Sequence, residues 1–247
     1  MHWRPRRAAG ATPARVARPV EWVACESIPA AERAAAEFIA RQLATAVRER
    51  GRASLAISGG RSPWGMLDQL ASQAVSWESV HLFQVDERIA PPDDEARNWK
   101  RFLKGALARR VPPENRHPMP VDIEAPGTAA DTYARTLVEW TGQPPELDVV
   151  HLGIGADGHT ASLFAGDSPL AETARLVAAS RRHEGYRRLT LTLPALAKAR
   201  SIVWFAVGAE RRAVLTRLFD GDTAIPASLV RRDRAVCFTD LAAAPTL

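Results

Sequence analysis

The sequence has little cysteine and lacks any long apolar run. Its 247 residues include only two cysteines, Cys25 and Cys237, which lie far apart in the chain. Two such cysteines give no disulfide framework and favour a reducing compartment. No stretch approaches the roughly 18 apolar residues that a membrane-spanning helix needs, and there is no secretory signal core. We therefore predict a cytoplasmic protein with no membrane partner.

Several catalytic motifs are also missing. The chain contains no G-x-S-x-G nucleophile elbow, no H-E-x-x-H and no C-x-x-C, and its six histidines are mostly scattered. The missing motifs argue against a serine-nucleophile hydrolase, a zinc protease and a dithiol redox enzyme. The scattered histidines give a metal site little support, so we expect no metal.

Positive charge is concentrated at the start of the chain. Residues 1–19 hold five of the 33 basic residues and no acid, so the other 28 bases balance the 28 acids. A basic arm can bind nucleic acid or act as a mitochondrial presequence, but the Pro, Gly, Ala and Arg content here is typical of a disordered extension. The neutral remainder argues against a nucleic-acid partner. We predict an extension at 1–19 and a single α/β domain at 20–247.

Apolar segments of strand length alternate with segments of helical periodicity. Continuous apolar strands between helices are typical of a mainly parallel sheet that is covered on both faces. We therefore predict a doubly wound, Rossmann-like α/β fold. Strands are expected at 21–25, 53–57, 80–85, 147–154, 175–180, 188–193, 201–207 and 234–239, and helices at 30–50, 62–71, 98–108, 128–141 and about 209–219. Alternation in the 188–193 strand predicts that one of its faces is less buried.

Three loops that leave predicted strands carry most of the polar chemistry. They are "SGGRSP" (58–63), the irregular acidic loop "DERIAPPDDEARN" (86–98) and "GADGHTASLF" (155–164). Ligands of open α/β sheets bind beyond the carboxyl ends of the strands. We therefore expect the three loops to meet around one pocket.

The "SGGRSP" loop is suited to binding an anion. Gly59 and Gly60 permit a tight turn with free backbone amides, Ser62 suits a helix N-cap, and Pro63 suits the first helical position. A helix N-terminus with free amides attracts phosphate. The loop lacks the Lys-Ser/Thr of a P-loop, which argues against nucleotide hydrolysis. A plain strand-to-helix turn is the alternative interpretation.

The acidic loop begins with three charged residues. Asp86, Glu87 and Arg88 follow the apolar strand "VHLFQV" directly. Arg88 would pair with an anionic substrate group or with the neighbouring acids. The alternative is an ordinary solvated loop.

The segment "GIGADG" (153–158) matches the G-x-G-x-x-G dinucleotide fingerprint. That fingerprint requires an acid at the end of the next strand, about 20 residues on. The next predicted strand here ends in Ser180, and Gly166 and Pro169 cut short any helix between them. The sequence therefore argues against NAD or FAD binding.

Asp157 and His159 offer a different chemistry for the same segment. Imidazole can take a proton from water and return one to a leaving group, and a nearby carboxylate orients it. The glycines allow a substrate to approach the backbone closely. Alternatively, His159 is structural and caps a short helix at 160–164. His151, inside the preceding strand, is interpreted as structural.

Taken together, the chain resembles the glucosamine-6-phosphate isomerase/6-phosphogluconolactonase family, and the lactonase branch in particular. The resemblance rests on "ISGGRSP", "VDERIAPPDDEARN", "LGIGADGHTASLFAG" and "RLTLTLPALAKAR". Their order and spacing, with "VWFAVGAERRAVL" and "CFTDLAAA", span most of residues 20–241. The third segment is the most specific.

The resemblance implies hydrolysis of a phosphorylated sugar lactone, 6-phospho-D-glucono-1,5-lactone, without a metal or nucleotide cofactor. It implies that His159 is the general base and that Asp157 orients it or binds a sugar hydroxyl. It also implies that Ser58, Gly59 and Gly60 hold the phosphate with Arg88. Further substrate-binding candidates are Asp86, Gly155, Gly158, Arg188 and Arg211. The sequence leaves open whether the chain is a monomer or a dimer.

The chain departs from the family pattern at a few positions. The family usually has proline at Ala156 and Ala165, serine at Arg97 and often lysine at Arg211. One alternative is an amino-sugar-6-phosphate deaminase/isomerase, but that branch tends to follow the histidine with "IAFNEP", where this chain has "TASLFAG". A second alternative is a non-catalytic sugar-phosphate sensor, which would be free to lose His159.

Overall fold

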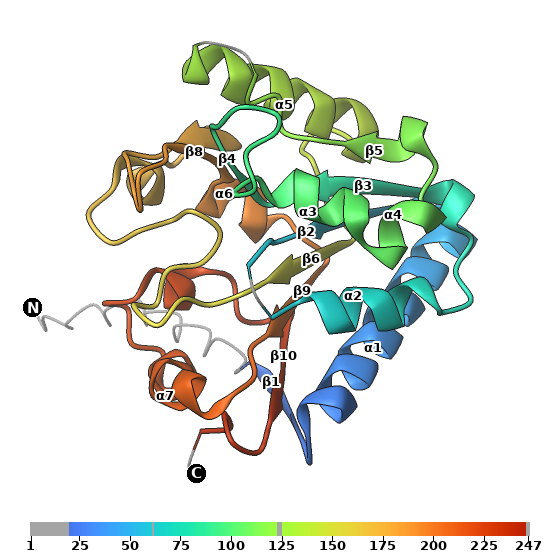
Figure 1. The fold of residues 1–247 in the computed structure, drawn as a ribbon, viewed down its shortest axis with the longest axis vertical. Coiled ribbons are helices and arrows are strands. Elements are labelled where there is room, and N and C mark those ends of the chain that lie inside the picture. The colour runs from blue at the N-terminus through green and yellow to red at the C-terminus, as the bar shows by residue number, and fades with distance from the viewer. Residues whose placement is uncertain (1–19, 61, 123–124, 246–247) are drawn as a thin grey trace, which may run out of the picture.

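The computed structural model describes residues 20–60, 62–122 and 125–245. The predicted extension at 1–19 lies outside these residues. Seven strands form one parallel sheet in the order β1-β10-β9-β6-β2-β3-β5 (Figure 1). They are β1 (Glu21–Cys25), β2 (Ala53–Ile57), β3 (Val80–Gln84), β5 (Arg116–His117), β6 (Val149–Leu152), β9 (Ser201–Phe205) and β10 (Ala235–Asp240).

Helices cover both faces of this sheet. The α helices are α1 (Ile28–Arg50), α2 (Trp64–Ala71), α3 (Asn98–Lys104), α4 (Ala106–Arg110), α5 (Pro126–Thr141), α6 (Leu193–Ala197) and α7 (Arg212–Asp220). The shorter 3-10 helices are η1 (Trp77–Ser79), η2 (Pro113–Asn115), η3 (Ser168–Ala171), η4 (Ala209–Arg211) and η5 (Pro226–Leu229). One core cluster contains residues of α1, α2 and α4, and the other contains residues of α5, α6 and α7. The predicted doubly wound α/β fold is confirmed.

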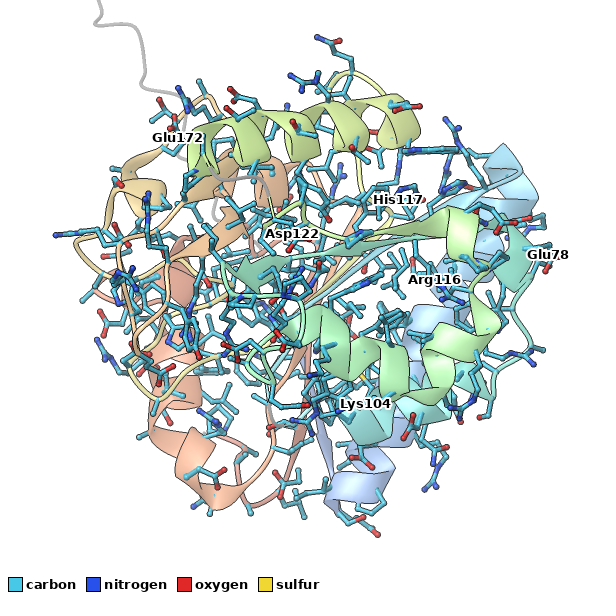
Figure 2. All side chains as sticks on the ribbon, turned by 45° about the horizontal axis from the view of Figure 1, so that its top comes forward. Glu78, Lys104, Arg116, His117, Asp122 and Glu172 are labelled. Carbon is cyan, nitrogen blue, oxygen red and sulfur yellow. The ribbon has the colours of Figure 1, made fainter. Side chains whose placement is uncertain are left out.

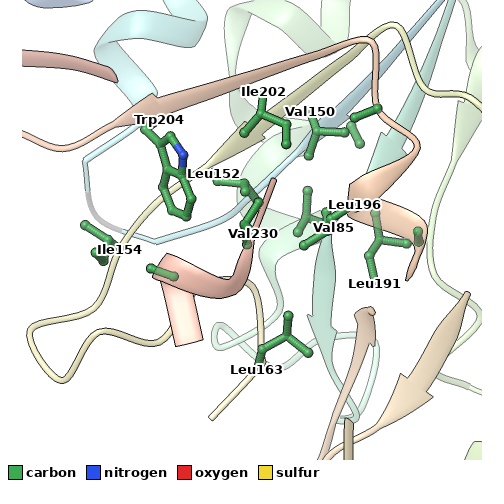
Figure 3. Packing of buried hydrophobic residues seen from close by; sticks show 14 of the residues in the cluster. Val85, Val150, Leu152, Ile154, Leu163, Leu191, Leu196, Ile202, Trp204 and Val230 are labelled. Carbon is green, nitrogen blue, oxygen red and sulfur yellow. The ribbon is translucent and has the colours of Figure 1, made fainter. Parts of the chain in front are cut away.

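The central strands are buried along their whole length because both of their faces pack against apolar side chains. Successive strand residues point to opposite faces, so Leu55 joins the α1 and α2 cluster while Ala56 joins the other. Figure 3 shows Leu152 of β6 and Trp204 of β9 in the second cluster, to which Ile154 and Leu163 also belong. The glycine-rich segment between Ile154 and Leu163 is therefore anchored in the core near both of its ends.

A second, antiparallel sheet lies beside the first. It contains β4 (Asp86–Arg88), β8 (Arg188–Leu191) and β7 (Val177–Ala179), in that order. The prediction that 86–98 is wholly irregular is therefore wrong at its start, where β4 pairs with β8. The prediction of a less buried face on the 188–193 strand is also wrong. All four residues of β8 are buried, because its polar side chains find partners inside: Thr190 Oγ1, for example, accepts the Ser162 N–H at 3.0 Å.

Three helix predictions also need correction. The segment 98–108 breaks at Gly105, whose extended backbone separates α3 from α4. The helix α2 begins at Trp64, and Pro63 rather than Ser62 is its N-cap, since the Pro63 carbonyl accepts the Leu67 N–H at 2.9 Å. Residues 160–164 form a turn closed by a Thr160–Leu163 bridge and not a helix, so His159 does not cap one.

Two buried histidines lie at the β5 edge of the large sheet. His81 Nδ1 of β3 lies 3.1 Å from His117 Nε2 of β5, and the Trp140 ring of α5 stacks on His81. Figure 2 shows His117 on its strand near α5. Burial, and after it the nearby His81, lowers the pKa of His117 to about 4. Burial and the positive charge of Arg52 also lower the pKa of His81.

This histidine pair makes the fold sensitive to acid. Because the folded pKa of His117 lies below the ordinary value near 6.5, only the unfolded chain takes up its proton between about pH 6.5 and 4. The unfolding free energy should therefore fall as the pH drops from 7 to 5, by up to about 2 kcal/mol for His117 alone. Urea unfolding at both pH values measures this loss. The His117→Gln variant should lose less stability than the wild type over the same interval, and an equal loss would contradict the assignment.

Candidate active site

The predicted loops meet around one cavity at the carboxyl edge of the large sheet. Its volume is about 480 Å³. It is lined by Ser58, Gly59, Gly60, Ser62, Pro63, Asp86, Arg88, Asn98, His151, Gly153, Ile154, Gly155, His159, Ala161, Glu184, Arg188, Phe205, Ala206 and Arg211. Most of these residues lie at the ends of β2, β6 and β9, in the loops that follow them, or in the β4–β8 pair, and Asn98 begins α3. The prediction that the three loops share one pocket is confirmed.

The "SGGRSP" loop forms one wall of the cavity together with the start of α2. Ser58 follows β2 directly, and Gly59, Gly60, Ser62 and Pro63 lead into the helix. The amino end of a helix carries partial positive charge from its free amides. The sequence prediction of anion binding therefore falls on this wall, of which the structure describes residues 58–60, 62 and 63.

Two arginines face the cavity from the small sheet. Arg88 and Arg188 are direct partners in the β4–β8 register. Arg88 Nη1 donates to the Ala96 carbonyl at 3.0 Å and to Asn98 Oδ1 at 2.7 Å. Arg188 is only 4% exposed, and its Nη2 donates to Glu184 Oε2 at 2.9 Å. Like charges directly opposite each other in a sheet repel, so an anion between the two guanidinium groups would relieve this repulsion.

A third arginine, Arg211, also lines the cavity. Arg211 follows β9 on η4, and its Nη1 donates to the Ile154 carbonyl at 3.1 Å. This bond places the charge of Arg211 beside the glycine-rich loop that carries His159. By contrast, Arg97, where the family usually has serine, donates from Nη1 to Asp122 Oδ1 at 2.9 Å; Asp122 is labelled in Figure 2.

A buried carboxylate fixes the segment that carries Arg88 and Asn98. Glu87 is fully buried and accepts the backbone N–H groups of Arg88, Asn98 and Trp99 at 2.7–2.8 Å, as well as Gln84 Nε2 at 2.9 Å. Burial raises the pKa of Glu87, and these four hydrogen bonds oppose the rise. The carboxylate thus joins the end of β3 to the start of α3.

The aspartate and the histidine of the glycine-rich loop form a direct pair. His159 Nδ1 lies 2.5 Å from Asp157 Oδ1, which also accepts the His159 backbone N–H at 3.2 Å. Partial burial raises the pKa of Asp157, but the charge and hydrogen bonds of His159 outweigh burial and lower it overall. An anionic Asp157 accepts from Nδ1–H, which leaves the lone pair on Nε2. This is the arrangement of an oriented general base.

Two glycines make this pairing possible. A Cβ atom on Gly155 would lie 2.2 Å from His159 Nδ1, so any other residue would displace the imidazole. Gly158 has a φ of +85°, and a Cβ atom there would lie 2.5 Å from the Ile225 side chain. Gly158 therefore shapes the loop against Ile225 and does not line the cavity, although the sequence resemblance named it as substrate-binding.

Asp86 links the small sheet to the same loop. Its Oδ2 accepts the Ser162 hydroxyl at 2.7 Å, and the Ser162 N–H donates to Thr190 Oγ1. The turn after His159 is therefore fixed to both β4 and β8. Asp86 lines the cavity, but its Oδ2 already accepts the hydrogen bond of Ser162.

Nine of the eleven predicted site residues line the cavity. They are Ser58, Gly59, Gly60, Asp86, Arg88, Gly155, His159, Arg188 and Arg211. Asp157 and Gly158 do not line the cavity, and Asp157 contacts the lining residue His159. Sequence reasoning missed Glu184 and Phe205, which no local pattern marks, and it interpreted the lining residue His151 as structural. Among the residues that the structure describes, no three His, Cys, Asp or Glu side chains are grouped to hold a metal ion.

The family model described as glucosamine-6-phosphate isomerases/6-phosphogluconolactonase matches residues 27–238. The chain belongs to this family. Family members include a protein of Synechocystis named 6-phosphogluconolactonase, 36% identical over 186 residues that cover 73% of this chain and 77% of that protein. A protein of Mycobacterium leprae with the same name is 37% identical over 195 residues, again 73% of this chain and 77% of that protein.

Solved structures agree with this family assignment. The crystal structure of 6-phosphogluconolactonase from Thermotoga maritima aligns with a TM-score of 0.80 and 26% identity, covering 89% of this chain and 99% of that chain. The family resemblance expected from the motifs is confirmed. Within residues 20–60, 62–122 and 125–245, moreover, no helix has both the length and the apolar character needed to cross a membrane.

The Glu87 carboxylate should stabilise the segment between the end of β3 and the start of α3. In Glu87→Gln, an NH₂ group would face two of the four buried donors, so we expect a loss of about 2–3 kcal/mol in unfolding free energy. Urea unfolding measures this loss. Glu95→Gln is a matched control on the same segment: its exposed carboxylate pairs only with Lys100 and Lys104. Equal stability of the two variants would refute the role given to Glu87.

Proposed function

We propose that this chain hydrolyses 6-phospho-D-glucono-1,5-lactone to 6-phospho-D-gluconate, with His159 as general base. One observation carries the proposal: the oriented Asp157–His159 pair opens onto the same cavity as Arg88, Arg188 and Arg211. A base and several cations around one cavity suit a substrate that has both a hydrolysable carbonyl and a phosphate group. The names of the relatives support this substrate.

The reaction needs one water molecule and one base. His159 Nε2 takes a proton from water, and the resulting hydroxide attacks C1 of the lactone to give a tetrahedral oxyanion. The bond between C1 and the ring oxygen then breaks, and the imidazolium returns the proton to that oxygen. The product is a carboxylic acid that releases its proton near neutral pH. No covalent nucleophile is required.

Charged groups assist at both ends of the substrate. Arg211, held beside the His159 loop through Ile154, would stabilise the C1 oxyanion and the product carboxylate. The amino end of α2, with Arg88 and Arg188, would hold the 6-phosphate. Residues of both groups line the same cavity.

Proton release tests the proposal most directly. Freshly made 6-phosphogluconolactone should release protons faster with the protein than in a blank that records spontaneous opening. Glucosamine-6-phosphate serves as a second substrate, since a deaminase would release ammonia from it. Ammonia release from glucosamine-6-phosphate without faster opening of the lactone would favour the deaminase alternative. If the protein accelerates neither reaction, the sensor alternative is favoured.

The base itself is tested by substitution. His159→Ala should lower kcat by roughly 10²–10⁴-fold, the usual contribution of a general base, with substrate affinity largely kept. Asp157→Asn should cause a smaller fall, since an amide oxygen can still accept from Nδ1–H without a charge. Steady-state kinetics measure both effects. Near-normal turnover by His159→Ala would exclude His159 as the base.

The proposed phosphate site, formed by the amino end of α2 with Arg88 and Arg188, predicts strong discrimination between substrates. Hydrogen bonds to charged groups contribute about 1.5–3 kcal/mol each. Unphosphorylated glucono-1,5-lactone should therefore show a kcat/KM at least about a hundredfold lower than the phosphorylated substrate. Arg188→Leu should reduce the ratio of kcat/KM between the phosphorylated and the unphosphorylated lactone. Similar rates for both lactones would contradict the assigned phosphate site.

A further inference from the structure

Two buried polar atoms on the cavity wall lack hydrogen-bond partners among the residues that the structure describes. They are Oγ of Ser58 and Nε2 of His151. Ser58 is 6% exposed and His151 only 1%. A buried polar group without a partner costs about 1–3 kcal/mol, so each such atom calls for an explanation. Neither atom takes part in the hydrolysis described above.

The proton on His151 can be placed from its contacts. Ser58 N–H lies 3.3 Å from His151 Nδ1, and because a backbone N–H can only donate, Nδ1 is the acceptor. Complete burial lowers the pKa of His151 to about 4, so the imidazole is neutral near pH 7. A neutral imidazole that accepts at Nδ1 carries its hydrogen on Nε2. His151 therefore presents one N–H donor for which the described protein supplies no acceptor.

The position of this donor indicates what it could bind. Register pairs place His151 of β6 beside Val203, on the sheet face that packs against α1 and α2. Its ring contacts the backbone of Ser58, at the point where the chain leaves β2 for the amino end of α2. His151 and Ser58 both line the cavity, as do Ser62 and Pro63, which lead into α2. Through its contact with Ser58, His151 thus belongs to the wall to which the proposed function assigns the 6-phosphate.

We propose that His151 is a substrate-binding residue whose Nε2–H donates a hydrogen bond to the phosphate group of the substrate, beside the Ser58 hydroxyl. This inference rests on the proposed function for the identity of the substrate. It goes beyond that function by assigning phosphate recognition to an uncharged, buried imidazole as well as to arginines. The expectation from the sequence that His151 is only structural is replaced by this role.

Two variants separate binding from structural support. In His151→Asn, the side-chain oxygen reaches the position of Nδ1 and can still accept from Ser58 N–H, but the donor at Nε2 is lost. In His151→Gln, the amide nitrogen reaches the position of Nε2 and restores the donor, but the acceptor for Ser58 is lost. Each variant thus removes one hydrogen-bonding function of the His151 imidazole: His151→Asn removes the donor at Nε2, and His151→Gln removes the acceptor at Nδ1.

The proposal predicts opposite kinetic results for these variants. His151→Asn should raise the KM for 6-phosphogluconolactone roughly ten- to a hundredfold with kcat nearly unchanged, as expected for a lost hydrogen bond to a charged group. His151→Gln should stay within about threefold of the wild type. The reverse order, or two variants that both behave like the wild type, would overturn the proposal. Thermal unfolding of both variants identifies any loss that comes from misfolding.

A binding measurement on the wild-type protein does not depend on turnover. Histidine labelled with ¹⁵N distinguishes protonated from unprotonated ring nitrogens by NMR, and the spectrum of His151→Asn assigns the signals of His151. Adding inorganic phosphate, and separately 6-phosphogluconate, should shift the Nε2–H signal much more than the Nδ1 signal. If either ligand saturates the protein and the Nε2–H signal of His151 does not shift, the proposal is refuted. If the protein binds phosphate in this way but does not open the lactone, only the proposed function fails.

Discussion

The parallel direction of β2, β6 and β9 is the constraint on which the whole site depends. Neighbouring register pairs, such as Ala56 with Val150 and Leu152 with Trp204, bring the carboxyl ends of these strands to one edge. Reversing any one strand would carry its loop to the opposite edge. A slip by one residue would exchange the two faces and would bury His151 among the residues of the second cluster. The apolar faces therefore fix the positions of the polar groups at the edge of the sheet.

The charged side chains around the cavity have partners that differ in burial. Burying a guanidinium group is costly unless it is paired and hydrogen-bonded. Arg188 pairs with Glu184, whose side chain is 84% exposed, and an exposed partner in high dielectric contributes little. Glu87 and Asp86 use their carboxylate oxygens on backbone N–H groups, Gln84 and Ser162. They therefore hold the framework together, and neither forms an ion pair with an arginine among the residues that the structure describes.

The sequence allowed the large sheet and most of the cavity to be predicted, because long apolar strands and helices have periodicities that a reader can recognise. It predicted strands at the positions of β7 and β8 but not their separate antiparallel sheet with β4, since the three residues 86–88 are too few to show alternation. The two-residue strand β5 was missed for the same reason. Its pairing with β3 buries His117 beside His81, which no local pattern indicates. The role of Asn98 likewise depends on a contact with Arg88 across a turn.

His151 and His159 show why residue type alone does not define a role. They are eight positions apart on one strand and its loop, and both line the same cavity. His159 keeps a side chain that is 29% exposed and has Asp157 on its Nδ1, so Nε2 is free to accept a proton. His151 is enclosed by the sheet and accepts at Nδ1 from Ser58, so Nε2 can only donate. In the proposed roles, the partner at Nδ1 decides between base and donor: a carboxylate acceptor leaves a lone pair on Nε2, and an amide donor leaves a hydrogen there.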